Sequence, residues 1–311
     1  MKKPTISVIM PVYNAEKFLD ESIQSIINQT FRDFEFIIIN DSSKDNSLKI
    51  IKSHNDYRIK LINNKKNLGL QKSLNKGLKI AKGKYITRMD ADDISLPNRF
   101  RIQLNFLEKN PSIFLIGSSV VVIDEKENKI GIFRKYDNFK KLKKKLLRSN
   151  TIIHPSIMFR NTRKIFYREK FKSSEDYDLY LRILSSGKRI TNLPNFLLKY
   201  RISKYSFVST MPNQEFFFQK AKEFYWQRIK KGVDDYENLI PPLREQKNSN
   251  FDKVNLYTKI LVEFQDNQMK KVRKDIKKFF KEFGINRILI IYYVLSFVPI
   301  RLTWFIKSKI L

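Results

Sequence analysis

The chain has 311 residues, 42% of them hydrophobic, which suffices for a packed core in one large domain or in one domain plus an appendage. It contains no Cys and only two His, so disulfides, cysteine nucleophiles and multi-histidine metal sites are excluded, and any metal ion needs mainly oxygen ligands. The net charge of +31 indicates either an anionic partner or simply a composition rich in Lys, Asn and Ile.

The first 110 residues alternate between short apolar runs and helical patterns. Four apolar runs predict buried strands, at residues 6–10, 34–39, 59–62 and 85–89. The helical patterns lie between and after them, at about residues 15–28, 47–52, 70–81 and 98–110. We expect Asn14 to cap the first helix and Gly83 to stop the third. This alternation predicts a mostly parallel sheet with helices on both faces.

Three polar residues follow predicted strands directly: Asn14, Asp41 and Asp90. Parallel sheets bind ligands beyond the carboxyl ends of their strands. We therefore expect these three distant stretches to converge on one rim of the sheet.

The pattern changes after residue 110. We predict a hairpin, a basic helix, a strand and a further helix, at residues 120–123 with 129–133, 139–147, 156–159 and 176–184. From about Met211 onward the chain reads as long, charged helical segments with a break at Pro241-Pro242.

Two acidic groups are candidates for chemistry. Asp90, Asp92 and Asp93 repel one another unless a cation joins them, which indicates a divalent metal bridging to phosphate, although short acidic clusters also arise by chance. Glu175-Asp176 begins a predicted helix. Carboxylates there are stabilised by the helix dipole, and the same place is a rigid mount for a catalytic base.

In combination, these motifs resemble the family-2 glycosyltransferases of the GT-A fold, over about residues 5–210. The residues that carry the resemblance are Ser7 to Asn14, Glu35 to Asp45, Asn67-Leu68-Gly69-Leu70, Gly83 to Ile86, Met89 to Asp93, Leu96 to Arg99, His154-Pro155-Ser156, Ser174 to Leu179 and Tyr200-Arg201.

The resemblance implies a GT-A domain at 1–210, with a nucleotide-sugar half at 1–110 and an acceptor half at 111–210. A helical C-terminal extension at 211–311 would follow. The implied activity is inverting transfer of a sugar, most commonly from a UDP-sugar, to a hydroxyl of a glycan or lipid-linked acceptor. The implied setting is the cytoplasmic assembly of a bacterial surface polysaccharide.

The resemblance also implies roles for individual residues. The nucleotide-sugar site would consist of Pro11, Tyr13, Asn14, Asp41, Asn67, Gly69, Asp90 and Arg201. Asp92 would bind Mn²⁺ or Mg²⁺ on the diphosphate, and Asp176 would be the general base. Glu175 and His154 would lie on the acceptor side, His154 either lining the site or serving the structure of its loop.

Within that site, Asp41 would hydrogen-bond the base, Asp90 would meet the ribose or sugar, and Arg201 would help to hold the diphosphate. Two positions depart from the family. Many members have Asp-Asp-Gly-Ser where this chain has Asn40 to Ser43, and many have a His where Ser203 stands.

The C-terminal region carries a separate signal. An apolar run at 288–300, interrupted by Pro299, follows a segment rich in Lys and is shorter than the roughly 20 residues that a spanning helix needs. Within 285–306 we expect a helix lying on an anionic membrane surface, which would make the protein peripheral on the inner face of the cell membrane. A buried helix and a membrane-spanning one are the alternatives.

Three other classes of function compete with the transferase. A nucleic-acid-binding protein would explain the charge, but we find none of its recognition motifs and expect no nucleic-acid partner. A dinucleotide-dependent oxidoreductase needs glycines where Pro11 to Asn14 stand. An inactive transferase-like scaffold would have no need to keep Asp92 and Asp176.

Overall fold

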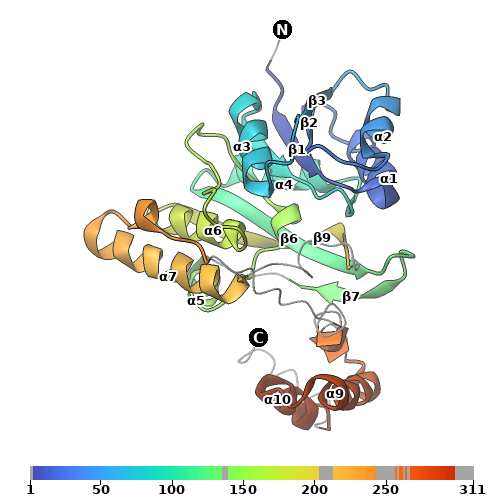
Figure 1. Ribbon diagram of the computed structural model, residues 1–311, viewed down its shortest axis with the longest axis vertical. Coiled ribbons are helices and arrows are strands. Elements are labelled where there is room, and N and C mark those ends of the chain that lie inside the picture. The colour runs from blue at the N-terminus through green and yellow to red at the C-terminus, as the bar shows by residue number, and fades with distance from the viewer. Residues whose placement is uncertain are drawn as a thin grey trace. The chain divides into compact units, whose positions relative to one another are not determined.

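The computed structural model describes residues 3–134, 139–202, 213–242, 256–257, 259–261, 263–264 and 267–297 (Figure 1). They belong to two compact units, which are described separately. The first unit comprises Met1–Val120, Arg134–Tyr200 and Met211–Asn248. The second unit comprises Val121–Phe133, Arg201–Thr210 and Ser249–Leu311. The division of the chain at residue 210 stays a prediction.

The sheet of the described chain is mixed and has the strand order β3-β2-β1-β4-β8-β6-β9-β5, with β7 beside β6. Its strands are β1 (Ile6–Val12), β2 (Phe34–Asn40), β3 (Ile59–Asn63), β4 (Tyr85–Arg88), β5 (Ile94–Ser95), β6 (Ile113–Ile123), β7 (Lys129–Phe133), β8 (Met158–Arg160) and β9 (Arg189–Arg201). The first four strands are mutually parallel, as predicted. Antiparallel β8 joins β4 to β6.

Helices cover both faces of the parallel part, with α3 on one side and α1 and α2 on the other (Figure 1). The helices of the first unit are α1 (Glu16–Ile27), α2 (Ser47–Ser53), α3 (Leu70–Ile80), α4 (Arg99–Lys109), α5 (Phe139–Leu146), α6 (Glu175–Ser185) and α7 (Gln214–Lys231). Strands β1 and β2 are buried along nearly their whole length because helices shield them from both sides.

The expected capping of α1 by Asn14 is wrong. The N-cap is Ala15, and the side chain of Asn14 instead accepts a hydrogen bond from the backbone N–H of Lys44 at 2.8 Å. The N–H groups at the helix start are satisfied from the loop after β2. Ser43 Oγ accepts from Asn14, Ser47 Oγ from Ala15 and Asp45 Oδ2 from Glu16, at 3.1, 2.9 and 2.9 Å.

The expected helix stop at Gly83 is also wrong. Helix α3 ends at Ile80, and its C-cap is Ala81, whose N–H still donates to the carbonyl of Gly77. Gly83 instead allows its own backbone to lie close to β1, because a Cβ there would lie 2.5 Å from the backbone nitrogen of Ser7. Only glycine fits at that separation.

The sequence predicts fewer of the elements after residue 110 than before it. The predicted elements match β7, α5 and α6, but they include only the last part of β6 and none of β9. The middle of β6 reads Gly117-Ser118-Ser119, which breaks the apolar run, and β9 contains Pro194 and two Asn. Both strands lack the continuous apolar pattern of β1 and β2.

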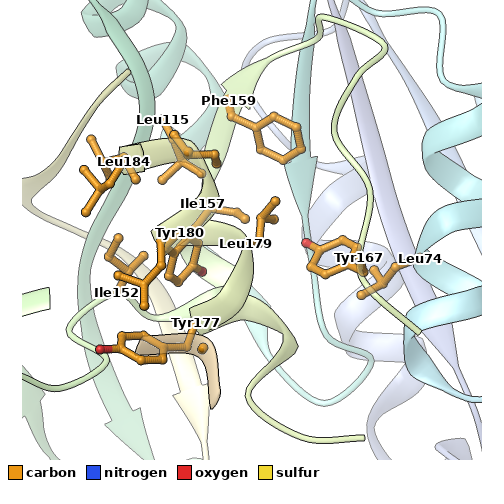
Figure 2. Packing of buried hydrophobic residues seen from close by; sticks show 14 of the residues in the cluster. Leu74, Leu115, Ile152, Ile157, Phe159, Tyr167, Tyr177, Leu179, Tyr180 and Leu184 are labelled. Atoms are coloured by element: carbon orange, nitrogen blue, oxygen red, sulfur yellow. The ribbon is translucent and has the colours of Figure 1, made fainter. Parts of the chain in front are cut away.

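Helix α6 is buried in the core of the first unit. Figure 2 shows Tyr177, Leu179 and Tyr180 of this helix packed among Ile152, Ile157 and other apolar side chains. Full burial of a large apolar side chain contributes roughly 1.5–3 kcal/mol. Several such contacts hold the first turn of α6 in place, and this turn carries Glu175 and Asp176.

The second unit has its own small core. It contains α9 (Met269–Phe283) and α10 (Arg287–Leu295), and Leu289 and Tyr292 of α10 are buried together with apolar side chains of α9. Asn286 caps α10 by accepting from the N–H groups of Ile288 and Leu289.

Candidate active site

The carboxyl ends of four parallel strands meet at one edge of the sheet. Val12 of β1 is in register with Asn40 of β2, which is in register with Asn63 of β3. On the other side of β1, the N–H of Met89 donates to the carbonyl of Ile9 at 3.0 Å, so β4 ends at the same edge. The register thus confirms that the residues following these strands share one rim.

Asp41 shapes a loop of this rim. Its buried carboxylate accepts hydrogen bonds from Asn64 Nδ2 at 2.7 Å, Leu68 N at 2.9 Å and Gly69 N at 2.8 Å. Gly69 has a φ of 88°, a left-handed conformation that favours glycine. Asp41 therefore ties β2 to the segment before α3, and its contact with a base stays a prediction.

Other residues expected to bind the nucleotide lie at the open part of the rim. Tyr13 is 50% exposed, and Asn14 and Asn67 are exposed as well. Asn67 Oδ1 also accepts from Gly69 N at 3.0 Å. Pro11 is half-buried in β1. The rim thus offers one aromatic face among polar groups.

The three carboxylates after β4 form a compact oxygen cluster. Asp90, Asp92 and Asp93 each place one oxygen within 4.8 Å of the others. Asp90 and Asp92 are half-buried and Asp93 is buried. Hard divalent cations prefer oxygen ligands, so this donor set fits Mg²⁺ or Mn²⁺.

Sequence reasoning missed Arg88, which neutralises part of this cluster. Its buried guanidinium binds both carboxylate oxygens of Asp90, with Nη1 2.7 Å from Oδ2. Burial alone would lower the pKa of Arg88, but Asp90 raises it above its ordinary value, so Arg88 stays charged. The sequence feature that could have revealed Arg88 is its position as a charged residue at the end of an otherwise uncharged buried strand.

Strand β8 brings the acceptor half to the same rim. It runs antiparallel to β4, with Met158 opposite Thr87, and Thr87 Oγ1 donates to the carbonyl of Ile157 at 2.8 Å. The short helix His154–Ser156 precedes β8 and therefore lies at the edge where β4 ends.

His154 is buried in a small polar group. Its Nε2 is 2.7 Å from the hydroxyl of Tyr167, and its Nδ1 is 3.9 Å from Glu175 Oε1. Burial and the nearby charge of Arg88 lower the pKa of His154 well below its ordinary value, so the ring is neutral at pH 7. Tyr167 was not foreseen from the sequence.

Asp176 is held from two sides. Its Oδ2 accepts from Asn150 Nδ2 and its Oδ1 from the N–H of Tyr177, both at 2.7 Å. Burial raises its pKa, and these hydrogen bonds only partly oppose the shift. A carboxylate whose pKa moves toward neutrality is a stronger proton acceptor, as a general base must be.

Glu175 is more deeply buried than Asp176. Burial and the neighbouring charge of Asp176 raise its pKa to about 8. Glu175 therefore favours its protonated form in the folded chain, so that Asp176 has no second negative charge directly beside it in the sequence.

The raised pKa of Glu175 predicts a specific pH dependence of stability. The folded chain holds a proton on Glu175 up to about pH 8, whereas an unfolded Glu loses it near pH 4.3. The free energy of unfolding should therefore fall as the pH rises between these values. Glu175→Gln should lose less stability than the parent between pH 5 and pH 8 in urea unfolding, by up to a few kcal/mol. Parallel pH profiles would contradict this assignment.

Arg201 belongs to the second unit. It is buried, and its Nη1 donates to the carbonyl of Asp124 at 3.1 Å within that unit. Its predicted role at the diphosphate stays a prediction. Ser203, the position of the expected histidine, lies outside the described residues.

The sequence model of glycosyl transferase family 2 matches residues 7–168, which include the whole parallel half and the acidic cluster. The chain belongs to this family. The transferase is 40% identical over 239 residues to an uncharacterized glycosyltransferase of Methanocaldococcus jannaschii, which covers 74% of this chain and 82% of the relative.

Two further likenesses are informative. The transferase is 32% identical over 206 residues to WfgD of Escherichia coli, named as a UDP-Glc:alpha-D-GlcNAc-diphosphoundecaprenol beta-1,3-glucosyltransferase, across 66% of this chain and 79% of WfgD. The structure of S. aureus TarS 1-349 with UDP-GlcNAc aligns with a TM-score of 0.62 at 18% identity, covering 92% of this chain and 82% of TarS 1-349. These findings confirm the GT-A fold and the transferase class.

Proposed function

We propose that the transferase moves a sugar from a nucleotide diphosphate sugar, with UDP as the expected nucleotide, to a hydroxyl of a glycan or lipid-linked acceptor. The observation that carries this proposal is Asp176, a carboxylate of raised pKa on a buried helix, beside the rim that bears the acidic cluster. The UDP-GlcNAc complex of TarS and the name of WfgD support the donor class.

The names of other relatives support a setting in surface-polysaccharide assembly. AmsE of Erwinia amylovora is named for amylovoran biosynthesis, and WbnJ of Escherichia coli for O-antigen biosynthesis. Their identities to this chain are 33% and 38%. We take the acceptor to be a growing bacterial glycan of this general kind.

Asp176 and Asp92 have different roles in the proposed reaction. Asp176 takes the proton of the acceptor hydroxyl, and the resulting oxygen attacks the anomeric carbon opposite the departing diphosphate. The bond from the anomeric carbon to the diphosphate breaks as the new glycosidic bond forms, which inverts the configuration. Asp92 would hold Mn²⁺ or Mg²⁺, whose positive charge stabilises the negative charge that grows on the leaving group.

A thermal-shift screen of nucleotide sugars tests the donor assignment. Ligands that bind only the folded state raise its apparent melting temperature. UDP-sugars should raise the melting temperature in the presence of Mn²⁺ and much less in its absence. If no nucleotide sugar shifts the transition in either condition, the proposed donor class is wrong.

We also propose that the second unit attaches to an anionic membrane surface on the cytoplasmic side. Within the described residues no helix has the length and hydropathy needed to cross a bilayer. Helix α10 buries Leu289 and Tyr292 but leaves Ile288, Ile291 and Val294 between 49% and 59% exposed. Exposed lysines line α9: Lys270, Lys271, Lys274, Lys277, Lys278 and Lys281. Apolar burial combined with lysines suits an interfacial helix.

Deletion of the chain after Phe283 should release the protein from vesicles that contain anionic lipid in a flotation assay. A gentler variant replaces Ile288, Ile291 and Val294 by Ser and spares the buried side chains of α10. It should also float less than the parent, because the apolar area available to the bilayer is reduced. Unchanged flotation of both variants would overturn the membrane proposal.

A further inference from the structure

Helix α5 has one buried face and one cationic face. Leu142 and Leu146 are buried in the core of the first unit. The helical turn continues past Leu146, since Ser149 N donates to the carbonyl of Lys145 at 2.9 Å. Lys140, Lys144 and Arg148 are exposed and spaced four residues apart, so they form one row on the surface, the α5 basic stripe.

The stripe lies in a segment without counter-charges of its own. Residues 139–168 contain no Asp or Glu, although they contain ten Lys and Arg. Helix α5 itself contributes only lysines among its charged residues. The positive field of this face is therefore not offset by acidic residues of its own segment.

The C-terminal end of helix α5 is hydrogen-bonded to the turn that carries Asp176. The hydroxyl of Tyr177 donates to the carbonyl of Leu146 at 2.6 Å, where α5 ends. Four residues later Asn150 donates to Asp176 at 2.7 Å. These two hydrogen bonds join the end of α5 to the first turn of α6, so Arg148 lies in the chain between two residues that contact this turn.

We propose that the α5 basic stripe binds a phosphate or diphosphate group of the acceptor and so directs the acceptor hydroxyl to Asp176. This inference rests on the proposed function. Lys and Arg are the side chains that bind phosphate through charge-assisted hydrogen bonds. The apolar face of α5 is already packed in the core, so the helix presents cations without apolar side chains to insert into a bilayer.

The test compares two triple variants with the same loss of charge. The first carries Lys140→Gln, Lys144→Gln and Arg148→Gln. The control carries Lys49→Gln, Lys52→Gln and Lys79→Gln, which are exposed positions on α2 and α3. The probe is a fluorescent short-chain alkyl diphosphate, and fluorescence anisotropy is measured in EDTA, so that no metal ion holds the probe at the acidic cluster.

The stripe variant should bind this probe about tenfold more weakly than the parent, as expected for the loss of three modest surface ion pairs. The control variant should bind within about twofold of the parent. Both variants should keep the thermal shift that nucleotide sugars cause in the parent. If the parent itself shows no such shift, the proposed function is refuted, whereas this inference is tested by the probe alone.

Equal losses in the two variants would show a general charge effect and overturn the proposal, as would unchanged binding by both. Vesicles with 30% phosphatidylglycerol provide the second arm. If the stripe variant loses vesicle binding but keeps binding of the soluble diphosphate, the stripe contacts lipid headgroups and the acceptor assignment is wrong.

Discussion

Replacement of Asp176 by Asn should abolish measurable sugar transfer, with a loss of about 10²- to 10⁴-fold, the usual contribution of a general base. Asn has nearly the same shape as Asp, and its single amide oxygen can still accept the hydrogen bond from the N–H of Tyr177. It cannot accept a proton from the acceptor hydroxyl. The loss should therefore appear in the chemical step, measured as single-turnover transfer with saturating donor and acceptor.

The same variant should leave donor binding intact. The Mn²⁺-dependent thermal shift caused by a UDP-sugar should match that of the parent, because Asp176 takes no part in the proposed donor contacts. If transfer and donor hydrolysis both survive Asp176→Asn, the assignment of the base is wrong.

A milder change at Asn150 tests the same assignment through pH. The hydrogen bond from Asn150 lowers the pKa of Asp176, against the effect of burial, which raises it. In Asn150→Ala this bond is absent, so the pKa of Asp176 should rise further. The acidic limb of the pH profile of kcat/KM should then move to higher pH. An unchanged limb would show that another group controls it.

Replacement of Asp92 by Ala should abolish transfer for a different reason. Asp92 is the residue that we assign to the divalent ion, and its carboxylate lies within 4.8 Å of those of Asp90 and Asp93. Without it, the charge that grows on the leaving diphosphate loses its stabilisation, an effect expected to reach about 10²- to 10³-fold, as for other electrostatic contributions.

The two losses should be distinguishable by donor binding. Asp92→Ala should reduce or remove the part of the UDP-sugar thermal shift that depends on Mn²⁺, whereas Asp176→Asn should retain it. Glu108→Ala, which removes an exposed carboxylate of α4 outside the cluster, is a matched control and should behave as the parent. A full Mn²⁺-dependent shift in Asp92→Ala would exclude this residue as the metal ligand.

The sequence predicts the parallel half of the sheet well because each of its strands is a short apolar run that ends in a polar turn. The predicted strand ends at Met10, Ile39, Ile62 and Met89 lie within two residues of the observed ones. Strand β9 was not predicted because Pro194 and the two Asn residues of this strand interrupt its apolar pattern. In the folded chain this segment is extended between β6 and β5, with which it pairs.

The residues of the candidate site also fall into those that the sequence predicts and those that it does not. Acidic residues that are adjacent in the chain, at 90–93 and 175–176, could be found by reading the sequence. The contacts of Asn150 with Asp176 and of His154 with Tyr167 could not, since they depend on the pairing of β8 with β4 and on the burial of α6. Arg88 was overlooked because strand residues are usually read only for their hydropathy.

The capping of α1 from outside the helix bears on protein engineering. Side chains of residues 43–47 satisfy the N–H groups of residues 14–16, so the two rim loops form one hydrogen-bonded piece. A graft that exchanges only one loop for that of a relative would leave helix donors without acceptors. Attempts to change the donor preference of this enzyme should therefore transplant residues 13–16 and 43–47 together.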